Sequence, residues 1–168
     1  MTQATLTVRD ERDPERDLVL ERVIDVPPER VWRAWTEPEQ LTQWFTPAPW
    51  STAAATIDLR PGGIFSVVMR TPEGEEVPQG AGCYLEVVPN RRLVWTGALG
   101  PGFRPNKREQ DALVFTAIIS IEPHGAGTKY TAHVMHEDAA DAQRHAEMGF
   151  QNGWGAALDQ LVALAKGG

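Results

Sequence analysis

The stretch ALVFTAIISIEPHGAGTKYTAHVMH (residues 112–136) contains two apolar runs, 112–122 and 128–136, joined by a turn that includes the letters HGAG. Both runs are rich in β-branched residues, which favour strands, and a glycine-containing turn between such runs indicates a hairpin. Strands joined this closely pair antiparallel, because parallel strands need a long crossover connection. The stretch therefore predicts an antiparallel hairpin near the C-terminal end of a sheet.

Further strand-like runs precede this hairpin, and short turns such as RPGG (60–63), TPEG (71–74) and PN (89–90) separate several of them. In the longest run, Gly80 and Gly82 mark expected bulges or bends. A series of strands with short turns favours an antiparallel meander of about six to seven strands. The expected strands before the hairpin cover residues 18–26, 55–59, 64–70, 77–88 and 91–99.

Two short helices are expected between the first and second strands. Pro27 and Pro28 end the first strand, and proline is tolerated in a first helical turn. Thr36 and Glu39 flank Pro38 in the spacing of a capping box, which predicts a second helix start. The apolar stripes of the two helices consist of Val31, Ala34 and Trp35 in the first and Leu41, Trp44 and Phe45 in the second.

One long helix is expected at the C-terminal end, over residues 140–166. Phe150, Trp154, Leu158 and Leu161 recur at three- and four-residue spacing, which predicts an inward-facing stripe and a largely buried Trp154. Three glycines interrupt the pattern, and they either bend the helix or allow the close approach of another backbone or a ligand. These glycines are Gly149, Gly153 and Gly155.

Length and composition exclude several classes of protein. A chain of 168 residues fits one domain, and 42% hydrophobic residues can form a sizeable core. The net charge of −7 opposes binding to nucleic acid or to an anionic membrane. The chain has no apolar run long enough to span a membrane and no N-terminal apolar signal core. The expectation is a soluble cytoplasmic protein with a polar arm over residues 1–17 and a single domain over 18–168.

Metal binding and nucleophilic catalysis find little support in the residues. The lone cysteine, Cys83, has no partner for a disulfide or a CxxC motif, and a small buried thiol is expected. His133 and His136 are three residues apart on a predicted strand, so they point to opposite faces, and His145 follows in the last helix. We therefore expect neither a metal nor a cofactor.

Four segments together resemble one known family. They are VPPERVWRAWTEPEQLTQWF (26–45), DLRPGGIFSVVMRTPEGEE (58–76), GCYLEVVPNRRLVWT (82–96) and EMGFQNGWGAALDQLVAL (147–164). Their order and spacing resemble the START-like (SRPBCC) superfamily, in the branch named after the C-terminal domain of the activator of heat-shock-protein-90 ATPase. The resemblance implies a helix-grip fold, which is an α+β architecture in which a curved antiparallel sheet grips the long C-terminal helix. The element order read from the residues agrees with that fold.

A curved sheet around one helix would leave a cavity, and such concave, mostly apolar spaces are the usual sites for small ligands. His136 is expected at the rim of this cavity. Glu147 faces its mouth if the last helix is regular there, and is solvated if that helix starts later. The candidate cavity-lining residues are Trp44, Phe65, Val67, Met69, Tyr84, Trp95, Phe115, Tyr130, His136, Glu147, Phe150, Trp154 and Leu158.

The loop GALGPGFRPNKREQD (97–111) is long for a compact domain, and such loops are often lids or binding loops. Arg104, Lys107 and Arg108 make it locally basic, so it could close over a polar headgroup. Simple surface mobility is the alternative interpretation.

Three functions stay open at this point. The favoured one is a non-catalytic protein, monomeric or homodimeric, that binds a small hydrophobic or aromatic ligand. The second is a co-chaperone that acts on a heat-shock ATPase, which rests on the name of the resembled branch. The third is a cyclase or hydrolase acting on an aromatic substrate, which requires Glu147, His136 or Tyr84 to face the cavity.

Overall fold

Seven strands form one antiparallel sheet in the computed structural model, which describes residues 7–110 and 112–167. The expected α+β architecture is confirmed, and the hairpin of residues 112–136 is the pair β8–β9. The first strand pairs with the last strand and forms one edge of the sheet. In sheet order the strands are β1 (Asp17–Ile24), β9 (Gly127–His136), β8 (Phe115–His124), β5 (Arg92–Thr96), β4 (Glu76–Val88), β3 (Ile64–Arg70) and β2 (Ser51–Ile57).

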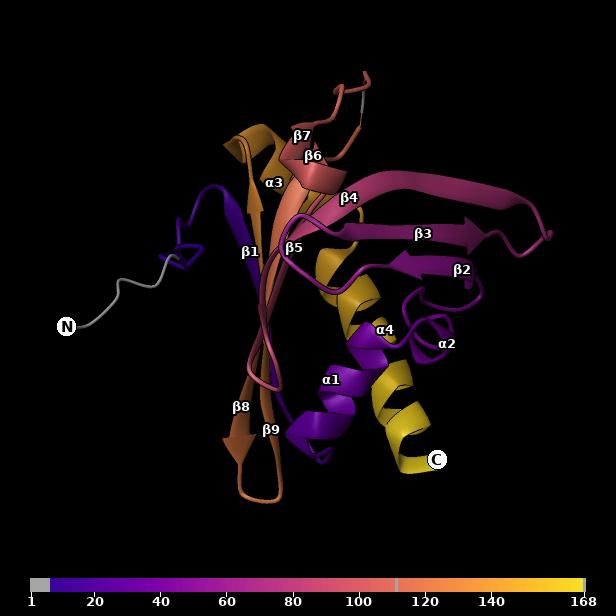
Figure 1. The fold of residues 1–168 in the computed structure, drawn as a ribbon, viewed down its shortest axis with the longest axis vertical. Coiled ribbons are helices and arrows are strands. Elements are labelled where there is room, and N and C mark those ends of the chain that lie inside the picture. Colours follow the sequence, from indigo (N-terminus) through magenta and orange to yellow (C-terminus); the bar gives the residue numbers. More distant parts are fainter. Residues whose placement is uncertain (1–6, 111, 168) are drawn as a thin grey trace.

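The helices α1 and α4 lie on one side of this sheet, with α4 running past the inner face (Figure 1). The core forms where the inward side chains of the strands meet both helices, as at Trp35 of α1 and Leu158 of α4. Burial of apolar surface is the main driving force of folding, so this contact holds the two layers together. The helices are α1 (Pro28–Thr36), α2 (Pro38–Leu41), α3 (Ala139–Glu147) and α4 (Phe150–Gly167).

The predicted long C-terminal helix is confirmed as α4, but its predicted extent over residues 140–166 was wrong, because the chain forms two helices there. Gly149 lies between them with φ +94°, a left-handed conformation that ends a right-handed helix and that glycine adopts without steric cost. The second helix starts afresh at Phe150. The break reorients α3 relative to the register assumed for a single helix, which changes where its side chains point.

The predicted capping box at Thr36 and Glu39 was also wrong. Residue Glu37, not Thr36, occupies the N-cap of α2, and no side chain caps that helix. The Thr36 hydroxyl instead donates to the carbonyl of Trp32, one turn back in α1. Thr36 still belongs to α1, where the four-residue spacing to Trp32 offers an acceptor within reach.

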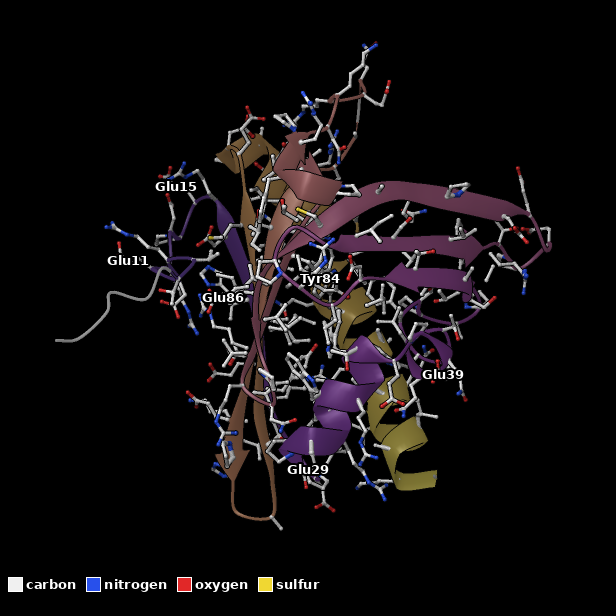
Figure 2. The ribbon with its side chains drawn as sticks, viewed as in Figure 1. Glu11, Glu15, Glu29, Glu39, Tyr84 and Glu86 are labelled. Atoms are coloured by element: carbon white, nitrogen blue, oxygen red, sulfur yellow. The ribbon has the colours of Figure 1, made fainter. Side chains whose placement is uncertain are left out.

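Bulges decide which side chains face inward. Gly80 has φ +83° where the β3–β4 register shifts, as expected for a bulge. A second shift lies between Tyr84 and Glu86. Residues two apart on a regular strand share a face, but this shift places Glu86 toward the N-terminal arm and Tyr84 toward the interior (Figure 2).

The expected strand over residues 91–99 ends early, at Thr96. Its hydroxyl accepts a hydrogen bond from the amide of Ala98 at 3.1 Å, which turns the chain away from the sheet. The segment that follows contains β6 (Leu99–Gly100), the short 3₁₀ helix η1 (Pro101–Phe103) and β7 (Arg104–Pro105). Residues 101–110 are all exposed, and Asp111, the last residue of the predicted loop, lies outside the described residues.

The described part of the N-terminal arm, residues 7–16, lies on the outer side of the sheet (Figure 1). The amide of Val8 donates to Glu86 Oε1 at 2.8 Å, and Arg92 forms ion pairs with Glu86 and Asp10. Residues 1–6 of the predicted arm lie outside the described residues. These contacts tie residues 8–10 to the outer face, opposite the helices.

Candidate functional site

A continuous group of aromatic rings fills the space between the inner face of the sheet and the helices. The ring centroids of Trp44 and Phe45 are 5.8 Å apart, those of Phe45 and Phe65 6.0 Å, and those of Phe65 and Trp95 4.8 Å. Trp95 in turn lies 5.5 Å from Phe115. Edge-to-face and tilted arrangements dominate, as expected for aromatic packing. We call these five residues the aromatic row.

Most of the predicted site residues are brought together around this row. The buried core cluster contains eight of them, and Phe115 and Trp154 pack against it while partly exposed. His136 is buried at the end of β9. The eight core members are Trp44, Phe65, Val67, Tyr84, Trp95, Tyr130, Phe150 and Leu158.

Two predicted residues are not brought into the core. Glu147 is exposed at the last position of α3, and its carboxylate accepts a hydrogen bond from Gln143, one turn back. It does not face the interior because Gly149 breaks the helix whose regularity that expectation required. Met69 is only half-buried, near the end of β3. Trp154 packs against the core cluster and keeps part of its surface exposed.

Sequence reasoning missed three members of the site: Trp35, Phe45 and His145. Trp35 lies 4.9 Å from Trp44 and 5.8 Å from Phe45 between ring centroids, so it packs directly on the aromatic row. Trp35 and Phe45 each belong to the apolar stripe of a predicted short helix, and this position was a signal that could have identified them as site residues. His145 carried no such signal, because its direction depends on the start and end of α3.

His136 and His145 form a buried pair beside the row. His136 Nδ1 lies 2.8 Å from the carbonyl oxygen of Arg16, and its Nε2 lies 3.0 Å from Nδ1 of His145. The His145 ring also stacks on Phe115, with centroids 5.1 Å apart and planes 14° from parallel. Burial, together with the nearby His136, lowers the pKa of His145 to about 4. His145 is therefore uncharged at neutral pH.

A surface cleft of about 390 Å³ opens next to these residues. Phe115 and His136 are part of its wall, and the remaining wall comes from the loop after β5 and from the ends of β8 and β9. The cleft is thus open at the end of the aromatic row. Its other lining residues are Gly97, Ala98, Asn106, Lys107, Arg108, Val114, Thr116, Met135 and Glu137.

A second hollow, of about 310 Å³, lies away from the row, between the turn after β2 and the helix η1. Phe103 is part of its wall, with φ +66° and a ring that lies against Gly62. Neither hollow is lined by a residue of α4. The aromatic row lies between the sheet and the long helix, where an internal cavity was expected.

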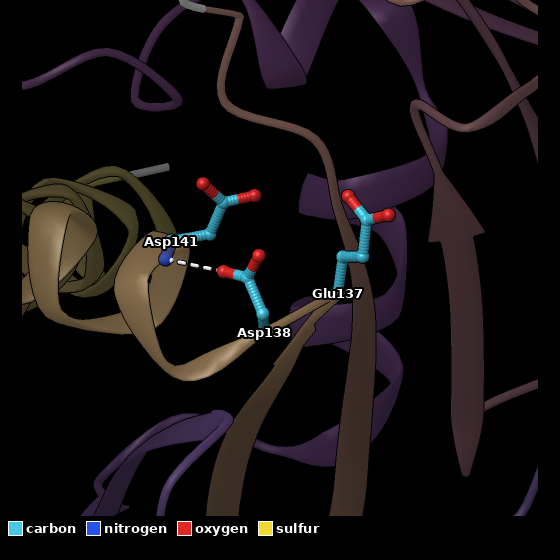
Figure 3. Close-up of side chains that lie close together, drawn as sticks. All are labelled: Glu137, Asp138 and Asp141. Atoms are coloured by element: carbon cyan, nitrogen blue, oxygen red, sulfur yellow. Dashed lines mark hydrogen bonds between the residues drawn. The ribbon is translucent and has the colours of Figure 1, made fainter.

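Three acidic side chains gather at the start of α3, beside the cleft (Figure 3). Asp138 caps the helix by accepting from the amide of Asp141 at 2.8 Å. Arg108 forms ion pairs with Glu137 and Asp141, which places a cation of the protein itself among these carboxylates. The cluster is thus occupied by an ion-pair network that attaches the loop to α3.

Two of the three side chains named as candidates for catalysis lie in the interior. His136 and Tyr84 are buried, but Glu147 is exposed. Cys83 is fully buried, as expected, and burial raises the pKa of its thiol, which disfavours the reactive thiolate. The enzyme interpretation stays an untested prediction that lacks one of its three named groups.

Comparison with known proteins places these features in a family. Residues 25–166 match the family model described as activator of Hsp90 ATPase homolog 1-like protein. No curated protein matches the chain. In the described part of the chain, no helix is long and apolar enough to cross a membrane.

Solved structures share the fold over nearly the whole chain. A crystal structure of a protein from Nitrosomonas europaea is 46% identical, covers 92% of this chain and 97% of its own, and superposes with a TM-score of 0.86. A crystal structure from Mycobacterium smegmatis is 26% identical, with 95% of each chain covered and a TM-score of 0.72. A solution structure from Arthrobacter aurescens, 24% identical over 96% of this chain and 92% of its own, has a TM-score of 0.75 and shows the shared fold alone.

Proposed function

This chain belongs to the family of activator of Hsp90 ATPase homolog 1-like proteins, and we propose that it binds a small hydrophobic or aromatic molecule on the inner face of its sheet. The expected site is the aromatic row together with the cleft where the row ends. The ligand would enter through the cleft and pack against aromatic rings, displacing or reorienting the partly exposed ones.

One observation carries this proposal: the aromatic row ends at a surface cleft rather than inside the core. Phe115 contacts Trp95 on its inner side and is part of the cleft wall on its outer side. Trp154 also contacts Phe115, with centroids 5.9 Å apart, and is itself only half-buried. The cleft wall combines apolar side chains such as Val114 and Phe115 with polar and charged ones such as His136 and Arg108. Small-molecule sites also combine apolar walls with polar groups that fix the orientation of the ligand.

The loop segment of residues 97–110, which follows β5, is the proposed gate of the site, and we call it the gate loop. Arg108 attaches it to α3 through Glu137 and Asp141, so this arginine is engaged with the protein's own carboxylates. The loop otherwise has exposed side chains over residues 101–110, which favours its displacement without loss of core packing. Opening of the loop would widen access to Phe115 and His136.

The experiment measures binding of a plain aromatic probe, 2-ethylnaphthalene, to the purified protein by equilibrium dialysis. Val114 is a half-buried residue of the cleft wall, so Val114→Trp should fill the cleft and weaken binding at least about 10-fold. The matched control is Val88→Trp on β4, where the original side chain is 40% exposed and does not line the cleft. Absence of binding to the parent protein, or equal loss in both variants, would contradict the proposal.

A second candidate function comes from the name of the family rather than from the geometry. It is the acceleration of a heat-shock ATPase, the activity after which the family is named. The test is the ATPase rate of purified Hsp90 with and without saturating amounts of this protein. An unchanged rate would exclude this function.

A further inference from the structure

Two buried polar atoms on the inner face of the sheet have no hydrogen-bond partner among residues 7–110 and 112–167. They are the hydroxyl oxygen of Tyr84, a side chain with no exposed surface, and the indole Nε1 of Trp95, a side chain that is 8% exposed. The two residues are direct partners across β4 and β5. A strand pair directs such neighbours to the same face, so both side chains lie on the side of the aromatic row.

Two other indole N–H groups of the same interior are paired. Trp44 Nε1 donates to the carbonyl of Ala34 at 2.9 Å. Trp35 Nε1 donates to the hydroxyl of Tyr130 at 3.2 Å. Buried polar groups are paired in the large majority of cases, so an unpaired pair of neighbours needs a specific reason. A ligand that supplies the missing partner is such a reason.

The surroundings of the two atoms define the chemistry of that ligand. Phe65 lies 5.4 Å from Tyr84 and 4.8 Å from Trp95 between ring centroids, and Phe45 and Phe115 are also neighbours of Trp95. None of these rings carries a charge. An ionised group placed here would lose its hydration without a counter-ion, which is strongly unfavourable. The indole N–H is a donor only, so its partner must be an acceptor.

We propose that the ligand has an apolar or aromatic body with one uncharged oxygen acceptor, such as a ketone, and that Trp95 Nε1 and Tyr84 Oη bind that oxygen. This inference rests on the proposed function and specifies the ligand class for the same site. The phenol of Tyr84 stays protonated and able to donate, because burial raises its pKa. The ligand oxygen then accepts from both residues, which satisfies both atoms at once.

The test compares two probes of similar size, 2-acetylnaphthalene and 2-ethylnaphthalene, which differ in one carbonyl oxygen. The measured quantity is the ratio of the dissociation constant of the ethyl probe to that of the ketone. Removal of one hydrogen bond should lower this ratio about 5-fold in Tyr84→Phe and, independently, in Trp95→Phe. The matched control is Trp50→Phe, which makes the same chemical change at a residue that is 41% exposed and should leave the ratio unchanged.

The urea-unfolding midpoints of two tyrosine variants show whether substitution of a buried tyrosine leaves the fold intact. Tyr84→Phe removes an unpaired group and should not lower the midpoint of urea unfolding, whereas Tyr130→Phe removes the acceptor of Trp35 and should lower it. If both probes bind and the ratio stays unchanged in Tyr84→Phe and Trp95→Phe, the oxygen-acceptor proposal is overturned and the apolar site stands. If neither probe binds to the parent protein, both proposals fail.

Discussion

His136 and His145, from β9 and α3, share one hydrogen bond of 3.0 Å in the interior. The carbonyl of Arg16 can only accept, so His136 Nδ1 carries the proton that it donates there. In the neutral form of His136, Nε2 is then the acceptor, and Nδ1 of His145 is the donor. The contacts thus assign the tautomer of each neutral ring and link the N-terminal arm, the sheet and α3 through hydrogen bonds.

We predict that protonation of His145 makes the free energy of unfolding decrease as the pH is lowered. Its pKa in the folded protein is about 4, below the ordinary value of 6.5, so the unfolded state binds the proton first as the pH falls. The free energy of unfolding should decrease from about pH 6.5 to about pH 4, by about 3 kcal/mol at most, since each unit of pKa corresponds to about 1.4 kcal/mol.

Urea unfolding between pH 4 and 7.5 measures this decrease. The variant His145→Phe should lose much of the pH dependence in that window while keeping the stack on Phe115. The matched control, His124→Phe, changes an exposed histidine and should keep the parent's pH dependence. An unchanged slope in His145→Phe would contradict the assignment.

Replacing two glycines of the C-terminal region by alanine should change the stability of the protein in opposite directions. Gly149 has φ +94° and open space where an alanine Cβ would lie, so Gly149→Ala should destabilise by about 1–2 kcal/mol through the backbone alone. Gly153 lies inside α4, also with open space, and Gly153→Ala should stabilise by about 0.5–1 kcal/mol. Chemical denaturation of both variants checks the sign, and equal effects would exclude Gly149 as the helix break.

Truncation of two aromatic residues on α4 should cost different amounts of stability, because one lies in the core and the other at the edge of the site. Phe150 is 2% exposed, so Phe150→Ala should cost about 3–5 kcal/mol. Trp154 is half-buried, so Trp154→Ala should cost less, about 2 kcal/mol, despite the larger side chain. Denaturation of both variants in urea gives the comparison, and a larger loss for Trp154 would show that it is core rather than edge.

The attachment of the gate loop should affect local opening more than global stability. Arg108 is 42% exposed, so its ion pairs with Glu137 and Asp141 are expected to contribute no more than about 1 kcal/mol. In Arg108→Gln, amide hydrogen exchange should speed up over residues 97–110 while the urea midpoint changes little. Lys107→Gln, the neighbouring change outside this network, is the control and should leave the exchange rates unchanged.

The local sequence determined the elements whose signal lies within a few residues. Alternating apolar residues and short turns predicted the antiparallel sheet, and the hairpin of β8 and β9 followed from residues 112–136. The spacing of Val31, Ala34 and Trp35 predicted the buried stripe of α1. These signals suffice because hydrophobic periodicity is set by the local geometry of strand and helix. The resemblance of four segments to one family identified the fold as a whole.

Only the tertiary structure decided which side chains meet. The bulge between Tyr84 and Glu86 sends two residues of one strand to opposite faces, and a one-residue shift of this kind is not visible in the strand's composition. The break at Gly149 exposed Glu147, and the placement of α3 against β9 brought His145 onto His136 across nine residues of sequence. Such contacts depend on the packing of whole elements against one another, which no local pattern of residues encodes.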